Sequence, residues 1–240
     1  MAWDTSTMTS STDGTPPPYG SDELEPPIDS HAASRRVSDR LEGALGDRPG
    51  TAGLVDMVRE FGDIDQAIYA AVAEVPTPAL DDRLRRLSLI ADHSMLWFGV
   101  AGVSALVGGK RGRRAALDGA VAIGITAFIV NVPLKNILPR RRPDRELHGV
   151  LTDRHVPLPT SPSFPSGHSA SAFAFATAFG GELPWVALPL RVAAAAVSWS
   201  RIHTGVHYPG DVVAGAVVGG AVGEAVGAFR RRREGRRILG

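Results

Sequence analysis

The pattern of apolar and polar positions separates a polar N-terminal stretch from a long hydrophobic remainder. Residues 1–50 are rich in Pro, Ser and Asp and hold few large apolar side chains. We expect a disordered tail there, because such a segment buries too little apolar surface to offset its conformational entropy. In residues 51–86, apolar residues recur at helical spacing between acidic ones, in a stretch too short and too polar to cross a bilayer. This pattern predicts an amphipathic helix at the membrane interface, ended by Pro76 and Pro78, and a linker after it.

Five apolar segments follow, and their lengths predict an all-α integral membrane bundle of about five spans. The segments are residues 87–107, 115–134, 168–181, 184–199 and 212–229. The third is short for a crossing, which takes about 20 residues. The first contains Asp92 and His93, which are costly in lipid unless they face the bundle interior or lie near an end. We therefore assign 87–230 to a membrane domain and 231–240 to a basic cytoplasmic tail.

Glycines in the fifth segment recur at a spacing typical of close helix contact. Each stands four positions after the last, at Gly215, Gly219, Gly223 and Gly227. Small residues at this spacing let two helices approach to backbone distance. The partner helix belongs either to the same chain or to a second copy, so a homo-oligomer through this segment is one expectation.

Local charge predicts an orientation in the membrane. If the spans alternate in direction, the end of the second segment, the start of the third, the end of the fourth and the start of the fifth share one side. Basic clusters at 110–114 and 230–237 share the opposite side, which the positive-inside rule makes cytoplasmic. The first side then faces outward from the cell membrane. Five spans also place the N-terminal tail outside, against which Arg83, Arg85 and Arg86 argue mildly.

Composition narrows the classes of function. The net charge is +1, so no global field favours nucleic acid as a partner. The absence of cysteine excludes disulfides and thiolate metal sites. No cluster of carboxylates in the sequence offers ligands for Mg²⁺, so we expect chemistry without a metal or another cofactor.

Three polar clusters stand at the ends of these apolar segments, on the side expected to face outward. They are Lys135-x6-Arg142-Pro143, Pro165-Ser166-Gly167-His168 and Ser200-Arg201-x5-His207-x3-Asp211. A guanidinium binds phosphate oxygens through paired hydrogen bonds, and a lysine adds a point charge. A histidine attacks phosphorus or transfers protons near neutral pH, and a carboxylate fixes its tautomer. Together these residue types indicate a site that handles phosphate.

The clusters resemble the three-part signature of the type 2 phosphatidic acid phosphatase family, which includes the vanadium haloperoxidases. All three parts are present and in order, over about residues 85–230. The resemblance implies that Lys135, Arg142 and Arg201 bind the phosphate oxygens and the charge that develops on them in the transition state. Ser166 and Gly167 would add a hydroxyl and a backbone N–H at the N-terminus of a helix.

The resemblance also implies a division of labour between two histidines, which the residues alone leave open. His207 would attack phosphorus and form a phosphohistidine intermediate. Asp211 would bind the other nitrogen of that ring and stabilise its positive charge. His168 would protonate the leaving group and then activate the water that releases the enzyme.

Other polar residues close to the clusters lie outside the signature. Arg140 and Arg141 are interpreted as interfacial anchors that follow a span. His203 is interpreted as structural. Asp92 and His93 are candidates for a metal site or a proton relay. Two adjacent residues are too few to form such a site, so packing is the favoured interpretation.

The expected function is hydrolysis of a phosphomonoester or diphosphate carried by a lipid at the membrane. The resemblance supplies the substrate class, which comprises phosphatidic acid, phosphatidylglycerophosphate and polyprenyl phosphates or diphosphates. An outward-facing site favours a polyprenyl carrier lipid. Two alternatives are a vanadate-dependent haloperoxidase, against which the apolar spans argue, and a non-catalytic membrane scaffold of the same fold.

Overall fold

Every regular element in the described part of the chain is a helix, which confirms the all-α prediction. The computed structural model describes residues 52–239, so the predicted disordered tail, 1–50, lies outside the described residues. The long helices are α2 (Ala52–Glu74), α3 (Pro78–Ile90), α4 (Met95–Val107), α5 (Gly109–Ile129), α7 (Gly167–Glu182), α8 (Pro184–His203) and α9 (Pro209–Leu239). The short elements are η1 (Asp92–Ser94), η2 (Val130–Leu134), α6 (Lys135–Ile137) and η3 (Thr152–Arg154).

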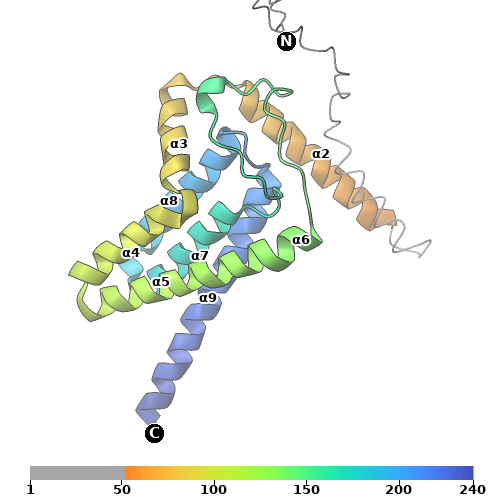
Figure 1. Cartoon of the computed structure of the whole chain (residues 1–240). Coiled ribbons are helices and arrows are strands. Elements are labelled where there is room, and N and C mark those ends of the chain that lie inside the picture. Colours follow the sequence, from red (N-terminus) through yellow and green to blue (C-terminus); the bar gives the residue numbers. More distant parts are fainter. Residues whose placement is uncertain (1–51, 240) are drawn as a thin grey trace, which may run out of the picture.

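Helix α7 lies at the centre of the bundle, with α5, α8 and α9 packed around it (Figure 1). Most of its residues are Ala, Ser, Gly or Phe, and these small side chains let the neighbouring helices approach closely. Phe175 and Phe179 supply the bulk of the core, with ring centroids 4.9 Å apart, and Trp97 of α4 lies 5.4 Å from Phe175. The short third segment is therefore the buried central helix.

The glycine stripe of α9 packs against α7 within the same chain. A Cβ added to Gly219 would overlap the carbonyl oxygen of Ala170, and one added to Gly223 would lie 2.7 Å from the Cβ of Thr177. Gly215 is equally close to the backbone at the start of α7. Gly215, Gly219 and Gly223 therefore pair two helices of the same chain, which is one of the two expected partners. A homo-oligomer through this segment stays a prediction.

Several predicted boundaries differ from the structure. The segment 87–107 is not one continuous helix, because α3 and α4 meet at η1 with a bend of 59°. The linker predicted after Pro78 is also helical, since α3 begins at this proline, whose missing N–H costs nothing in a first helical turn. At the other end, the predicted basic tail of residues 231–240 continues α9 as far as Leu239.

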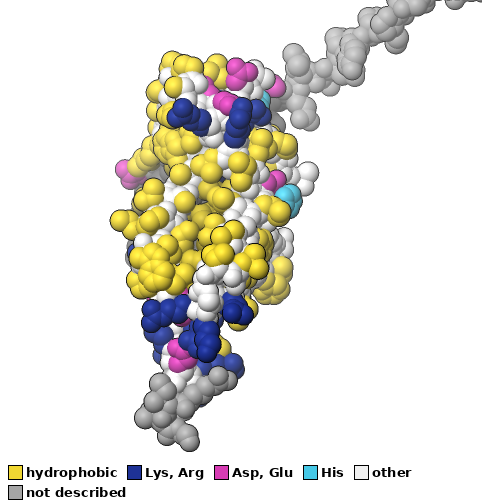
Figure 2. All heavy atoms as spheres, turned by 90° about the vertical axis from the view of Figure 1, so that its left-hand side faces the viewer, with side chains coloured by type: hydrophobic (Ala, Val, Ile, Leu, Met, Phe, Trp, Pro, Cys, Tyr) yellow, Lys and Arg dark blue, Asp and Glu magenta, His cyan; other side chains and the backbone are white. Residues whose placement is uncertain are grey.

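The membrane character of the chain rests on its apolar helices. Among the described residues, two helical stretches are long and apolar enough to cross a bilayer, Gly109–Ile137 and Pro209–Glu234. The bent pair of α3 and α4 makes a third if it is counted as one span. The face drawn in Figure 2 carries hydrophobic side chains across its middle, with Lys and Arg gathered toward both ends. The total of five spans stays a prediction.

The two ends of the bundle have different chemistry. At one end, upper right in Figure 1, α6 and the end of α8 meet the starts of α7 and α9, and the segment 138–166 runs beside them. The starts of α7 and α9 are joined directly, because the Ser166 N–H donates to the carbonyl of Asp211 at 2.9 Å. At the other end, Arg230 of α9 pairs with Asp118 of α5, and Arg114 lies 3.3 Å from Glu234. All three signature clusters fall at the first end.

Candidate active site

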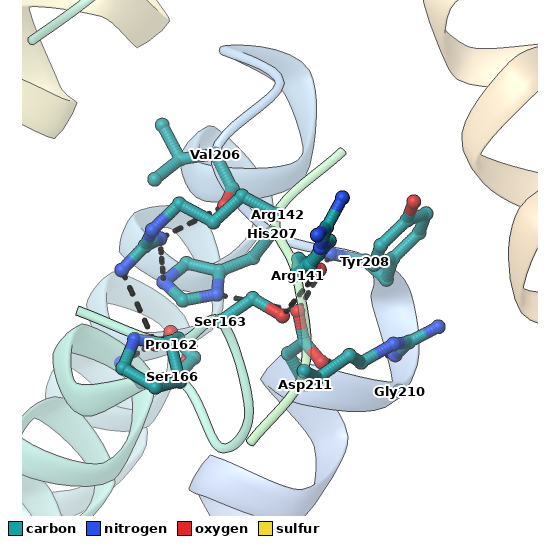
Figure 3. Close-up of polar contacts among 12 residues, drawn as sticks. Arg141, Arg142, Pro162, Ser163, Ser166, Val206, His207, Tyr208, Gly210 and Asp211 are labelled. Atoms are coloured by element: carbon teal, nitrogen blue, oxygen red, sulfur yellow. Dashed lines mark hydrogen bonds and ion pairs between the residues drawn. The ribbon is translucent and has the colours of Figure 1, made fainter. Parts of the chain in front are cut away.

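The third cluster forms a buried histidine–carboxylate pair where α8 gives way to α9. His207 lies in the connection between the helices and Asp211 in the first turn of α9, and both are almost fully buried. Asp211 Oδ2 accepts from His207 Nδ1 at 3.3 Å and from the Tyr208 N–H at 3.0 Å (Figure 3). Gly205 makes the turn before this pair with φ of +68°, where a Cβ would also lie 2.9 Å from Arg145. Backbone geometry therefore sets the position of His207.

Arg142 identifies the free nitrogen of His207. Its Nη1 lies 3.3 Å from His207 Nε2 (Figure 3). A guanidinium only donates hydrogen bonds, so Nε2 is the acceptor and the ring proton sits on Nδ1, facing Asp211. Burial lowers the pKa of His207 to about 4, opposed by Asp211 and reinforced by Arg142 and Arg201. The ring is therefore neutral at neutral pH, with a lone pair on Nε2.

The cations of the first cluster are held by the segment that precedes α7. Arg142 Nε donates to the carbonyls of Pro159 and Ser161 at 3.1 and 3.0 Å, and Nη1 donates to the carbonyl of Val206 at 3.0 Å. Lys135, at the end of the π-helical turn, donates from Nζ to the Ser161 hydroxyl at 3.0 Å. Ser161 thus links the two predicted phosphate-binding cations.

Arg201 is a buried cation with an open donor. Its side chain is 3% exposed, and Nη1 donates to the carbonyl and hydroxyl of Ser88 on α3. Its Nε is buried and has no hydrogen-bond partner among the described residues. Burial lowers the pKa of Arg201 to about 10, so the guanidinium keeps its charge at neutral pH. A buried charge with an unpaired donor is suited to an anionic ligand.

The N-terminus of α7 brings in the second cluster. Ser166 caps the helix, with its Oγ accepting from the Ser169 N–H at 3.5 Å, so its hydroxyl has a structural use. Gly167 is the first helical residue, and its N–H has no partner within a helix. His168 follows in the first turn, and the charge of Arg201 acts on its ring. The structure thus brings the second and third clusters together.

Asp92 is a residue of this site that sequence reasoning assigned to packing, and that interpretation is wrong. Its side chain is half exposed, and Oδ1 lies 3.1 Å from His168 Nε2. The signal was present in the sequence, because a carboxylate inside an apolar segment is costly unless it has a partner. The partner stands 76 positions later, so spacing alone gave no sign of it.

Arg140 is also a part of the site, which corrects its interpretation as an interfacial anchor. Its Nη1 lies 2.9 Å from Asp211 Oδ1 and 2.6 Å from Asp65 Oδ2, and its guanidinium stacks 4.0 Å from the centroid of Tyr208. Asp65 comes from α2 and also accepts from the Gly210 N–H at 2.6 Å. The two carboxylates raise the pKa of Arg140 against the effect of burial. Arg140 therefore connects Asp65 of α2 to Asp211.

His203 lies outside this arrangement, in a buried network that agrees with its structural interpretation. Its Nε2 is 2.9 Å from Asp81 Oδ1, and the fully buried Arg154 pairs with the same carboxylate at 3.0 Å. Arg154 also donates to the carbonyl of Val75 at 2.7 Å, near the end of α2. This network joins α2, α3, α8 and η3. Arg141, the other predicted anchor, is exposed.

The arrangement joins an anion-binding group to two histidines. It brings together Lys135, Arg142, Ser166, Gly167, His168, Arg201, His207 and Asp211, all eight of the predicted site residues. The added members, Asp65, Asp92 and Arg140, are carboxylates and a cation that contact the predicted ones. Such a site can bind a phosphoryl group, attack it with a neutral imidazole and transfer a proton.

Comparison with known proteins agrees with this chemistry. The family model of the PAP2 superfamily, which describes the sequences of its members, matches residues 115–234 of this chain. The decaprenylphosphoryl-5-phosphoribose phosphatase of Mycobacterium tuberculosis is 33% identical over 175 residues, which cover 71% of this chain and 94% of that protein.

Two solved structures share the fold. One is the transmembrane PAP2-type phosphatidylglycerolphosphate phosphatase from Bacillus subtilis, with a TM-score of 0.57 and 21% identity over 85% of this chain and 96% of that one. The other is LpxE from Aquifex aeolicus, with a TM-score of 0.51 and 22% identity over 68% and 94%. The chain belongs to the PAP2 superfamily, as a membrane phosphatase that acts on lipid phosphates.

Proposed function

We propose that the chain removes phosphate from a polyprenyl-linked phosphomonoester or diphosphate through a phosphohistidine intermediate, on the outer side of the membrane and without a metal. The observation that carries this proposal is the neutral, buried His207, whose Nε2 faces the Arg142 guanidinium while Nδ1 faces Asp211. The name of the Mycobacterium tuberculosis relative supports a polyprenyl-linked substrate. Phosphatidic acid and phosphatidylglycerophosphate are the other members of the expected class.

In the first step, the lone pair of His207 Nε2 attacks phosphorus. A nitrogen–phosphorus bond forms while the bond between phosphorus and the leaving oxygen breaks. The ring becomes positively charged, and Asp211 stabilises that charge through the Nδ1–H bond. His168 gives a proton to the leaving oxygen, which departs as an alcohol or as a lipid phosphate.

In the second step, water replaces the enzyme on phosphorus. His168, now neutral, takes a proton from the water as its oxygen bonds to phosphorus. The nitrogen–phosphorus bond breaks, its electron pair returns to His207 Nε2, and inorganic phosphate leaves. Each histidine ends in the state in which it began.

The cations act on the charge that develops on the phosphoryl oxygens. Arg142 and Arg201 lie close enough to His207 to lower the pKa of its ring, so both are placed to contact a phosphoryl group bound at Nε2. Lys135 and the Gly167 N–H at the positive end of α7 complete the set of donors. All of these groups belong to the protein, so the proposed reaction requires no metal.

Phosphate release by purified protein in detergent tests the proposal. With a short-chain polyprenyl diphosphate, we expect His207→Ala to lose at least about 10³-fold in kcat, the scale for a missing nucleophile. Arg201→Ala should lose activity as well. The matched controls are His155→Ala in the segment 138–166 and Arg111→Ala at the opposite end of the bundle, both expected to keep wild-type rates.

A second measurement tests the intermediate itself. Rapid acid-free quenching during turnover of ³²P-labelled substrate should trap label on the wild-type protein, in a bond that is labile to acid and stable to base. His207→Ala should trap none. Full activity in His207→Ala, or label retained there, would refute the assignment of the nucleophile.

A further inference from the structure

The break between α3 and α4 is strained and precedes the segment matched by the family model. His93 and Ser94 have φ of 49° and 61°, a left-handed conformation that side chains other than glycine rarely adopt. Each such residue costs on the order of 1–3 kcal/mol and persists where its surroundings hold it in place, often at functional sites. The consequence here is a 59° bend that interrupts an apolar segment at Asp92.

The bend places a carboxylate against the second histidine of the site. Asp92 Oδ1 lies 3.1 Å from His168 Nε2 and accepts the His93 N–H at the same distance, while Oδ2 lies 3.4 Å from His93 Nδ1. The charge of Asp92 also acts on Arg201. Asp92 therefore faces two members of the proposed phosphate site.

The contact defines which nitrogen of His168 remains for chemistry. A carboxylate accepts, so the bond at 3.1 Å requires a proton on Nε2. Proton exchange with a substrate is left to Nδ1. His207 shows the opposite arrangement, because Asp211 holds its Nδ1 and leaves Nε2 free. The site thus contains two histidine–aspartate pairs that present different nitrogens.

We propose that Asp92 is the positioning residue of the general acid, holding His168 through Nε2 so that Nδ1 transfers the proton to the leaving oxygen. This inference rests on the proposed function, in which His168 is that acid. As the phosphorus–oxygen bond breaks, the oxygen takes the Nδ1 proton and the electron pair of that N–H bond stays on the ring. Asp92 keeps its hydrogen bond to Nε2–H throughout, and its negative charge favours the imidazolium, which burial and the charge of Arg201 oppose.

If Asp92 acts through the general acid, the loss of activity caused by Asp92→Asn depends on the leaving group of the substrate. An alkoxide leaves poorly without a proton, whereas p-nitrophenolate leaves readily as an anion. With octyl phosphate, Asp92→Asn should lower kcat/KM, which reports the steps through release of the leaving group, by about 10²-fold, the lower range for general acid catalysis. With p-nitrophenyl phosphate, the kcat/KM of the same variant should stay within about threefold of wild type, because little proton transfer to the leaving group is needed.

Two variants give this comparison its reference points. His168→Ala reports the loss of the acid itself and should show the same dependence on the leaving group. Asp82→Asn makes the same chemical change on α3, where the carboxylate is exposed and pairs with Arg86 at 2.8 Å, and it should match wild type on both substrates. Adding Asp92→Asn to His168→Ala should cause no further loss, because Asp92 acts only through His168.

The outcomes separate the two proposals. If His168→Ala loses kcat/KM equally on both substrates, His168 is not the acid, and the proposed mechanism and the role of Asp92 fail together. If His168→Ala shows the dependence and Asp92→Asn loses equally on both substrates, Asp92 is only structural and this inference alone is overturned. A lower KM with undiminished kcat in Asp92→Asn would also overturn it, since Asp92 would then be an anion that competes with substrate.

Discussion

At the scale of single residues, the proposed mechanism requires a neutral His207, because only the unprotonated Nε2 has a lone pair that can attack phosphorus. Burial lowers its pKa to about 4, and the hydrogen bond and charge of Asp211 act in the opposite direction. We expect a ¹⁵N-histidine titration by NMR to give a midpoint near pH 4 for this ring. Asp211→Asn should move the midpoint lower still, because it removes the charge that favours the imidazolium.

The same shift has a consequence for stability. Between about pH 4 and 6.5 the unfolded chain binds a proton at His207 that the folded chain does not, so this residue makes stability rise with pH across that window. The contribution is fully present above the unfolded pKa and lost as the pH falls through the folded one. A midpoint near 6.5, or a higher one in Asp211→Asn, would contradict the buried neutral ring.

Site residues were predictable from the sequence where the partners lie only a few positions apart. His207 and Asp211 are four positions apart, and the structure joins them. Arg140 and Asp211 are 71 positions apart, and Asp65 and Gly210 are 145 apart. No periodicity relates such partners, because only the packing of α2 and α9 brings them together. The residues outside the signature were therefore missed for a physical reason.

At the scale of elements, α2 contacts the candidate site from outside the segment matched by the family model, and we expect it to support the proposed reaction. Asp65 holds both Arg140 and the Gly210 N–H, one residue before Asp211. Asp65→Asn should lower kcat by roughly tenfold with little change in KM, because a charged hydrogen bond contributes about 1.5–3 kcal/mol and only part of it acts on Asp211. Glu60→Gln, an exposed carboxylate on the same helix, is the matched control. Equal rates for both variants would show that α2 has no catalytic part.

The other face of α2 fits its predicted place at the membrane interface. Phe61, Ile64 and Ile68 are each about half exposed or more, whereas Asp65 and Tyr69 are buried against the bundle. This division is typical of a helix that lies on a bilayer surface. The interfacial position stays a prediction, and it would place membrane contact and the support of Asp211 on opposite sides of one helix.

The contact between α7 and α9 depends on the absence of side chains. Gly219→Ala should destabilise the fold by about 1–3 kcal/mol, because its Cβ would meet the carbonyl of Ala170, which belongs to a helix backbone and cannot move aside. Gly220→Ala adds the same methyl group where nothing lies within 4 Å. Thermal unfolding in detergent should give a lower midpoint for the first variant alone. Equal midpoints would indicate that the two helices separate easily.

The elements themselves were largely predictable from apolar runs, since α7, α8 and α9 each cover one predicted segment and α5 with η2 covers another. The ends of these helices were not predictable in the same way. The strained turn at His93 and Ser94 divides the first segment, and hydropathy does not register it because the apolar run continues on both sides. The helical continuation of α9 through the basic C-terminus was also not predicted, because a run of charged residues is compatible with either a helix or an irregular tail.

At the scale of the whole molecule, the two ends of the bundle differ in a way that determines where chemistry takes place. The candidate site lies at one end, and the basic residues at the start of α5 and at the end of α9 lie at the other (Figure 1). The bent pair of α3 and α4 carries the chain from the first end to the second. The structure therefore brings the signature clusters to one end, as alternating spans predicted, while the membrane side of that end is still to be measured.

The membrane side of the candidate site can be measured by cysteine labelling, because the chain contains no cysteine of its own. Leu158→Cys would place a thiol at an exposed position of the segment 138–166, and Arg232→Cys one at an exposed position near the other end. A membrane-impermeant maleimide should label Leu158→Cys on intact cells and Arg232→Cys only after the membrane is broken. This follows because basic residues are retained on the cytoplasmic side. The opposite labelling would place the site inside the cell and exclude carrier lipids presented only at the outer leaflet.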